Sequence, residues 1–486
     1  MTDSSIPVDQ FVREFGDQIE AGNGSVFAGA GMSTYAKLAD WDKLIAPFKN
    51  RLKVGGEVTD QAQLMQYAQD DPGIGRGPIE AAVYKAISKV PPKNPSVFHD
   101  KVGALGLKSI WTTNYDDLIE HFSEDEQIFV VSDDDALSEP RARGRTPLYK
   151  MHGTIDRKAG VMREMVLSRS DYENYERTRP RFWTLLQAEF LTGSLFFVGF
   201  SFDDPNVGLI FRLVRQLKLE KTSNHYAVLK KPTGDPAKQA LHECRVREFA
   251  QVGVRIVEIE DYDEIAEIVM ALSVRAKPAQ VYMAGSPPGR KKRGSGGAYP
   301  TKELSDGLAS FCVTLGHELA SARLPVRFLG GSAVAAEVGY ALLRDNRDSG
   351  TYRSKDFVML RRCKDERLED PRVRLGRIEF AGDDQDELRS HAFSQVRAAV
   401  FIGGGTGTKS EIKRAQQQRI GVIPIASTGG ASRAVWVQMS ENLERYRLGG
   451  GRIDQVSFAQ LDHGNPRTVA RATVKLLRQA MFLDPT

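Results

Sequence analysis

Residues 26–33 read VFAGAGMS, an apolar run that ends in a glycine-rich turn. Residues 400–408 read VFIGGGTGT, a second run and turn of the same kind in the other half of the chain. A glycine-lined turn between a strand and a helix lets backbone N–H groups and the positive end of the helix dipole approach a phosphate closely. The two turns therefore predict two nucleotide sites on one polypeptide, one for chemistry and one for control.

The composition is that of a globular protein with more than one domain. The 486 residues are 41% hydrophobic and 27% charged, and the chain is too long for a single ordinary domain. The formal net charge of +4 is small for this length and gives no reason to expect a nucleic-acid partner. The three cysteines, Cys244, Cys312 and Cys363, are too scattered for a disulfide framework or a four-cysteine zinc site. We therefore expect no bound metal.

The sequence also lacks the signals of a membrane or secreted protein. No apolar run approaches the roughly 18 residues that a membrane span requires. The first twenty residues lack the basic and apolar regions of a signal peptide. The expected protein is thus soluble and cytoplasmic, without a membrane partner.

Short β-branched or aromatic runs alternate with helical patterns along both halves, which predicts parallel βα units. The expected strands are residues 25–30, 108–112, 148–152, 195–199, 226–229 and 254–259 in the first half, and 281–284, 326–329, 357–360, 377–380, 398–402 and 421–425 in the second. Between the halves, residues 275–280 (RAKPAQ) are interpreted as a linker. We predict an α/β protein with two Rossmann-like parallel-sheet domains, residues 1–277 and 278–486. The basic, glycine-rich stretch 287–300 is either a surface loop or a phosphate-binding loop.

Three further segments of the first half follow expected strands, namely residues 112–116 (TTNYD), 152–153 (HG) and 199–201 (GFS). Because the carboxyl ends of parallel strands face one crevice, these segments should converge on the first glycine turn. The order GAGxS, TxNxD, HG and GxS resembles the NAD-binding core of the sirtuin family, across most of residues 20–260.

The resemblance to sirtuins implies a role for each of these residues. The residues that would bind NAD⁺ are Ala28, Gly29, Ala30, Gly31 and Ser33 at the phosphates and ribose, Thr113, Asn114 and Asp116 at the nicotinamide pocket, and Gly199 and Ser201 on the adenosine side. His152 would act as the base. Asp116 has a second interpretation, because an Asp after a strand often caps the following helix.

The chain also departs from the sirtuin deacylases. Those enzymes carry a zinc ribbon with two cysteine pairs, which helps to form the acyl-lysine groove, and the three scattered cysteines exclude such a ribbon here. Of the sirtuin reaction, the step that remains possible without this groove is cleavage of the nicotinamide–ribose bond, which passes through an oxocarbenium-like centre. Asn114 would orient a water or a ribose hydroxyl, and His152, titrating near neutrality, would activate that nucleophile.

An NAD⁺ glycohydrolase is thus the expected activity, with NAD⁺ as substrate. Two alternatives stay open. A protein-lysine deacylase would act on an acetylated peptide, and a non-catalytic nucleotide-sensing module would never release nicotinamide.

In the second half, three glycine clusters follow expected strands, and they resemble the SLOG superfamily. Its Lonely Guy phosphoribohydrolases carry the segment PGGxGTxEE, where residues 403–411 read GGGTGTKSE. The proline is replaced by Gly403 and the first glutamate by Ser410. Loss of one carboxylate disfavours hydrolysis but leaves the anion-binding backbone, so we expect a sensor domain. Its expected ligand contacts are Gly285, Ser286, Gly330, Arg372, Arg389, Gly404, Gly405, Thr406, Gly407, Thr408 and Glu411, although either arginine taken alone fits an exposed surface residue.

A sirtuin-like domain fused to a SLOG domain resembles the effectors of the Thoeris antiphage defence system. The resemblance implies an NADase that depletes NAD⁺ and is inactive until its SLOG domain binds a cyclic ADP-ribose isomer made by a TIR-domain partner. It also implies a homo-oligomer, a tetramer or larger. The identity of the isomer and the choice between a hydrolysed and a cyclised product stay open.

Overall fold

The computed structural model describes residues 5–36, 38, 41–54, 58, 60–94, 96–123, 127–138, 144–200, 225–287, 304–330, 332–365 and 376–483. The chain divides into two compact units, Met1–Ala276 and Lys277–Thr486. Each is built on a parallel sheet with helices, so the predicted fold class is confirmed. Among the described residues, no helix combines the length and apolar character needed to cross a bilayer.

The main sheet of the first unit has the strand order β1-β10-β9-β8-β2-β3-β5-β4, and each neighbouring pair is parallel. The bounds are β1 Ser5–Ile6, β2 Gly24–Ala28, β3 Ser109–Thr112, β4 Ile128–Val131, β5 Thr146–Lys150, β8 Ser194–Val198, β9 His225–Lys230 and β10 Val254–Ile259. Every strand predicted for this half is present within two residues, whereas the short β1 and the edge strand β4 were missed.

Helices cover both faces of this sheet, so its central strands β2 and β8 are buried at every position and are mostly apolar. The helices are α1 Val8–Glu20, α5 Val97–Lys101, α6 Leu118–Phe122, α7 Arg169–Glu173, α8 Tyr175–Thr178, α9 Pro180–Thr192, α11 Pro236–Gln251 and α12 Glu264–Arg275. On one face, Phe11 of α1 packs on Phe196, with ring centroids 4.6 Å apart. On the other face, Phe190 of α9 stacks on Phe197 at 5.9 Å.

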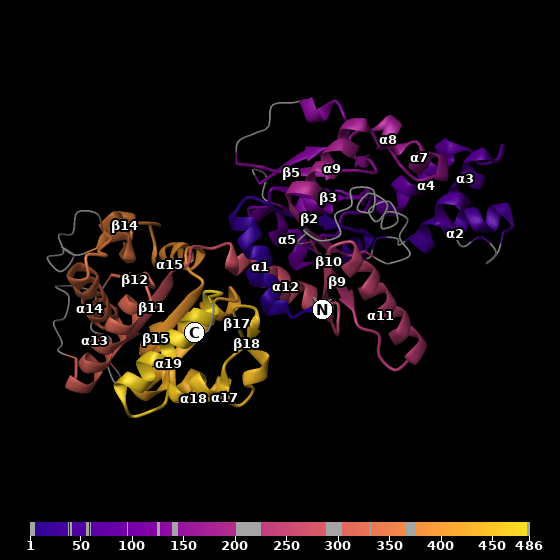
Figure 1. Cartoon of the computed structure of the whole chain (residues 1–486). Coiled ribbons are helices and arrows are strands. Elements are labelled where there is room, and N and C mark those ends of the chain that lie inside the picture. Colours follow the sequence, from indigo (N-terminus) through magenta and orange to yellow (C-terminus); the bar gives the residue numbers. More distant parts are fainter. Residues whose placement is uncertain are drawn as a thin grey trace. The chain divides into compact units, whose positions relative to one another are not determined.

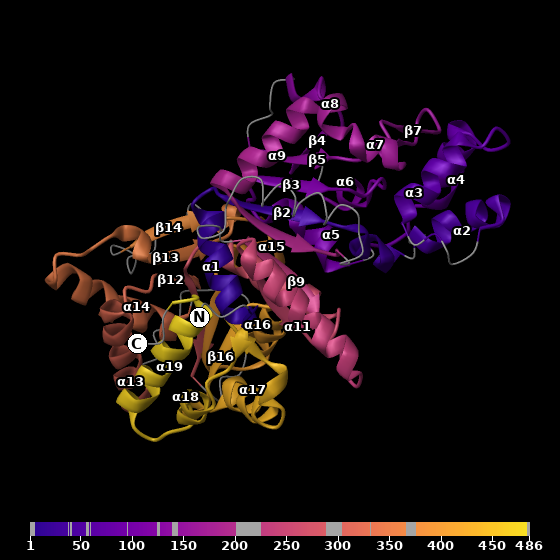
Figure 2. The same ribbon diagram turned by 45° about the vertical axis from the view of Figure 1, so that its right-hand side comes forward.

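A helical module is inserted between β2 and β3. It consists of α2 Trp41–Leu52, α3 Gln61–Asp70 and α4 Arg76–Ile87, which lie side by side in Figure 2. Together with the hairpin of β6 Thr154–Asp156 and β7 Val161–Arg163, these helices form a hydrophobic cluster separate from those of the sheet. An ion pair between Arg76 Nη1 and Asp171 Oδ2, at 2.7 Å, joins α4 to α7.

The sheet of the second unit has the order β14-β13-β12-β11-β15-β16 and is parallel. The bounds are β11 Val281–Ser286, β12 Val326–Leu329, β13 Phe357–Arg361, β14 Arg377–Phe380, β15 Ala398–Gly403 and β16 Gly421–Ile425, each within two residues of its prediction. The helices are α13 Asp306–Ser321, α14 Ala333–Asp348, α15 Gln385–Ser394, α16 Thr406–Gln417, α17 Gly430–Ser440, α18 Gln455–Gln460 and α19 Pro466–Ala480. Figure 1 shows α13 packed between α14 and α19 along this sheet.

Both sheets reverse their strand order next to the glycine turns. In the first unit β2 lies between β3 and β8, and in the second β11 lies between β12 and β15. Ligands of open α/β sheets bind beyond the carboxyl ends of strands at such reversal points. The second turn opens an α-helix, α16, as predicted. The first turn does not open an α-helix. It continues instead into a 3₁₀ helix, η1 (Ala30–Ala36).

Candidate functional site

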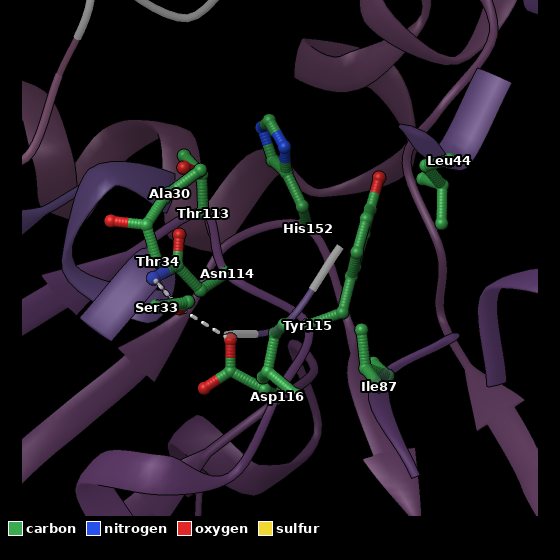
Figure 3. A pocket seen from close by; sticks show the side chains of 11 residues that line it. Ala30, Ser33, Thr34, Leu44, Ile87, Thr113, Asn114, Tyr115, Asp116 and His152 are labelled. Carbon is green, nitrogen blue, oxygen red and sulfur yellow. Dashed lines mark hydrogen bonds between the residues drawn. The ribbon is translucent and has the colours of Figure 1, made fainter. Parts of the chain in front are cut away.

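A pocket lies at the carboxyl end of the first sheet, where the predicted segments converge. It holds about 610 Å³ of empty space, counting the part open to solvent. Its lining residues are Ala30, Ser33, Thr34, Leu38, Leu44, Ile87, Thr113, Asn114, Tyr115, Asp116 and His152. In Figure 3, Ser33, Asn114 and Asp116 lie together, and Tyr115, Leu44 and Ile87 form the opposite wall.

A hydrogen-bonded network orders the polar wall. Asn114 Nδ2 donates to the carbonyl oxygen of Gly29 at 3.0 Å and to Ser33 Oγ at 2.9 Å. Ser33 Oγ in turn donates to Asp116 Oδ2 at 2.6 Å. Asp116 Oδ1 also accepts a bond from the backbone N–H of Leu118, the first residue of α6, so Asp116 both lines the pocket and contacts the start of this helix. The network leaves Asn114 Oδ1, which is buried and has no hydrogen-bond partner among the described residues.

The glycines of the first turn bring two stretches of main chain together. The N–H groups of Gly29 and Gly31 donate to the carbonyls of Val198 and Gly199, at 2.9 and 2.8 Å. A methyl group on Gly29 or Gly31 would lie 2.6 or 2.7 Å from the carbonyl oxygen of Gly199. Gly199 itself has a φ of +75°. These glycines therefore clamp η1 against the end of β8, and the amides of Gly29 and Gly31 are already in use rather than directed at a phosphate.

His152 is buried, with 2% of its surface exposed, and its ring meets the rings of Tyr172 and Tyr175 edge-on at 5.3 and 6.1 Å. Burial lowers the pKa of His152 to about 3, and the charge of Arg179 acts in the same direction. The prediction that His152 titrates near neutrality is therefore wrong, because the fold removes the imidazole from water. The ring is neutral at physiological pH and can accept a proton. Its Nε2 has no hydrogen-bond partner within the described part of the chain.

Three buried histidines should make the fold sensitive to acid. Burial lowers the pKa values of His99 and His225 to about 4 and that of His152 to about 3, from 6.5. Below pH 6.5 the unfolded chain binds protons at these histidines while the folded protein does not. The free energy of unfolding therefore decreases as the pH is lowered. We expect a loss of about 1 kcal/mol per histidine and pH unit, from pH 6.5 towards 4. Thermal unfolding at pH 7, 6 and 5 measures this, and an unchanged midpoint would contradict it.

Two basic residues that the sequence analysis missed hold the loop after β3. Lys150 Nζ donates to the carbonyl oxygen of Asp116, and Arg157 contacts both carboxylate oxygens of Asp117 at 2.6 Å. Arg157 also donates to the carbonyl of Ser88, just beyond α4. A lysine inside the apolar stretch PLYKM of residues 147–151 was the available signal.

In the second unit, the three glycine clusters also meet at the carboxyl edge of the sheet. Ser332 Oγ donates to the carbonyl of Gly285 at 3.0 Å, and the N–H of Gly404 donates to the carbonyl of Ser286 at 2.8 Å. The N–H of Gly330 bonds to the carbonyl of Leu360. Of the residues predicted at the second turn, Gly404 and Thr408 are buried against each other, whereas Gly405, Thr406 and Gly407 are exposed.

Glu411 and Arg389 do come together, but they bond to each other. Arg389 Nε lies 3.3 Å from Glu411 Oε1, and the hydroxyl of Tyr282 donates to Glu411 Oε2 at 3.2 Å. Burial raises the pKa of Glu411, although Arg389 opposes the shift. Glu411, which was expected to contact the ligand, thus already has two side-chain partners in this structure. Nothing in the sequence marked Tyr282 as a partner of Glu411, because it lies in the apolar strand β11 like an ordinary core residue.

Some predicted residues lie outside the described part of the chain. They are Ser201, Arg372, and all but one residue of the basic stretch 287–300. Among the described residues, no group of three or more His, Cys, Asp or Glu side chains is placed to hold a metal ion.

Family models match within both units. The model of the SIR2-like domain matches residues 108–256, which include Asn114 and His152, and that of the SLOG cluster3 family matches residues 385–461, which include Arg389 and Glu411. Curated relatives also match this chain along nearly its whole length. The chain is similar to ThsA.

The NAD(+) hydrolase ThsA of Bacillus cereus (strain MSX-D12) is 24% identical over 478 residues, which cover 94% of each chain. ThsA of Cytobacillus dafuensis is 25% identical and covers 90% of this chain and 89% of its own. Defense-associated sirtuin 2 of Bacillus subtilis is 27% identical over 45% of this chain and 22% of its own. The likeness to ThsA thus spans both units.

Proposed function

We propose that this protein is an NAD⁺ glycohydrolase that releases nicotinamide and ADP-ribose from the pocket of its first unit. The observation that carries the proposal is that Asn114 and His152 line one pocket, and that each has a buried polar atom, Oδ1 and Nε2, without a partner among the described residues. Buried polar groups are normally paired, so two such atoms in one cavity indicate a ligand. The relatives named NAD(+) hydrolase ThsA support the choice of NAD⁺.

The pocket residues suit an attack of water on the ribose carbon C1′. Because Nδ2 of Asn114 is held by Gly29 and Ser33, its Oδ1 is the acceptor that orients the water. The water oxygen bonds to C1′ as the bond from C1′ to the nicotinamide nitrogen breaks, and the electron pair of that bond leaves with neutral nicotinamide. The water proton passes to neutral His152 and then to solvent. The apolar wall of Leu38, Leu44 and Ile87 limits the access of other water molecules.

The second unit is proposed as the control. In this proposal a cyclic ADP-ribose isomer, produced by a TIR-domain partner protein, binds at the turn of residues 403–408 and switches on NAD⁺ cleavage during antiphage defence. The match to the SLOG cluster3 family and the exposed Gly405–Gly407 positions support it. The proposed assembly is a cytoplasmic homotetramer or a larger homo-oligomer.

One experiment tests the activity. Full-length protein is incubated with NAD⁺, with and without a panel of cyclic ADP-ribose isomers, and nicotinamide and ADP-ribose are followed by chromatography. We expect release that one isomer increases. If no nicotinamide is released with any isomer, the alternative of a non-catalytic nucleotide sensor is favoured instead. An acetylated peptide is included, because deacetylation that consumes NAD⁺ would replace the proposal with a deacylase.

A further inference from the structure

Lys150 is the last residue of β5, and its side chain is fully buried, with 0% exposed. Its Nζ donates to the main-chain carbonyl of Asp116 and lies 2.9 Å from Glu120 Oε1 on α6. Lys150 does not line the pocket, yet it stands two residues before His152. A buried ammonium thus lies directly behind the polar wall.

The contacts of Lys150 join the two segments that carry the proposed catalytic groups. Backbone bonds link these segments at two points, from the N–H of Met151 to the carbonyl of Thr112 and from the N–H of Ile155 to the carbonyl of Tyr115, both at 2.9 Å. Lys150 adds a charged bond one residue further on, at Asp116. From Asp116 the network continues through Ser33 Oγ to Asn114 Nδ2. The position of the Asp116 peptide therefore affects the whole polar wall.

A pair between a fully buried lysine and a glutamate that is 18% exposed is a poor way to stabilise a fold. Removing the lysine charge and most of the carboxylate from water costs so much that an apolar pair of the same size is often as stable. Burial raises the pKa of the Glu120 carboxyl, with Lys150 opposing the shift, which shows the cost of placing this carboxylate here. Stability alone therefore does not account for the lysine, and its role is better explained by the group that it holds, the main-chain carbonyl of Asp116.

We propose that Lys150, neutralised by Glu120, is a positioning residue that fixes Asp116 and thereby the recognition of the nicotinamide end of the substrate. The inference rests on the proposed function, because it assigns the pocket to NAD⁺. Lys150 touches no substrate and acts through the Asp116 peptide. Its loss should weaken ligands that carry nicotinamide and spare those that lack it.

The test removes the pair as a unit. A single substitution would leave an uncompensated buried charge and unfold the protein, so the variant is Lys150→Met with Glu120→Gln. The matched control is Lys108→Met with Glu189→Gln, since Lys108 Nζ and Glu189 Oε2 form a pair at 3.0 Å at the opposite, amino end of β3. Calorimetry on full-length protein gives the affinity for ADP-ribose and for carba-NAD⁺, an analogue that is not cleaved.

We expect the Lys150/Glu120 variant to bind carba-NAD⁺ about 10-fold or more weakly, the effect of losing one charge-assisted hydrogen bond, while its affinity for ADP-ribose stays within about 2-fold. The Lys108/Glu189 control should bind both ligands like wild type. Unchanged affinity for carba-NAD⁺, or equal loss of both ligands, would overturn the inference. If the methionine variant does not fold, Lys150→Gln with Glu120→Gln is measured by the same criteria.

The readout separates this inference from the proposed function. If wild-type protein binds carba-NAD⁺ but never releases nicotinamide from NAD⁺, the proposed function fails and the binding ratio still decides the role of Lys150. If nicotinamide is released and the ratio does not change in the variant, only the positioning role fails.

Discussion

His152→Gln and Asn114→Ala are each expected to lower nicotinamide release by about 10²- to 10⁴-fold under activating conditions, the first by removing a positioned base and the second by removing the group that orients the water. Glutamine is preferred to alanine at position 152, because the imidazole is buried between Tyr172 and Tyr175 and truncation would leave a cavity. Asn114→Ala removes both the free Oδ1 and the bonds of Nδ2. Initial rates of nicotinamide release and the thermal midpoint are measured for each variant.

His242→Gln supplies the matched control. His242 is also buried, but it bonds to Glu258 at 2.9 Å on the α11 side of the sheet and does not line the pocket. It should keep wild-type release. If His152→Gln or Asn114→Ala is folded and still releases nicotinamide at a rate close to that of the wild type, the proposed catalytic pair is incorrect.

Gly405→Val is expected to abolish the response to the activating nucleotide. Nothing lies within 4 Å of a Cβ atom built at Gly405, so we expect valine to be accommodated in the resting protein and to occupy the space that a phosphate would need at the start of α16. A ligand activates only by binding the active state more tightly, with a typical coupling of about 1–3 kcal/mol, or roughly 5- to 150-fold. That activation should be lost. Nicotinamide release is titrated against activator concentration.

Gly464→Val, also in open space but in the loop before α19, is the control and should respond normally. Glu411→Ala should also lose the response, but it leaves Tyr282 and Arg389 without their common partner, so its thermal midpoint must be compared as well. Normal activation curves for both Gly405→Val and Glu411→Ala would show that the signal binds elsewhere.

The fold could be predicted from the sequence because its strands are short apolar runs with clear ends. The strands after which Asn114, His152 and Gly199 lie were found within two residues, and the geometry of a parallel sheet then requires their ends to meet. The short strand β1 was missed because two residues carry no periodicity.

The environment of the site residues could not be predicted, since it depends on contacts distant in sequence. The pKa of His152 follows from burial by rings contributed by α7 and α8. The hydrogen bond from the N–H of Gly31 to the carbonyl of Gly199 joins residues that are far apart in the chain. In the second unit, Glu411 is held by Tyr282, which no motif distinguishes from a core residue.

The helical module gives the pocket walls two different origins. The polar wall is built on strand ends of the main sheet, whereas Leu38, Leu44 and Ile87 belong to the hydrophobic cluster of the module. The same cluster includes Leu118, and Tyr115 packs against it, so it extends to the loop after β3 that carries Asn114. The width of this cavity is therefore set by how the helical module packs on that loop. Substitutions among the buried residues of α2–α4 are therefore expected to change the size of the cavity more than the positions of Asn114 and His152, which lie at strand ends of the sheet.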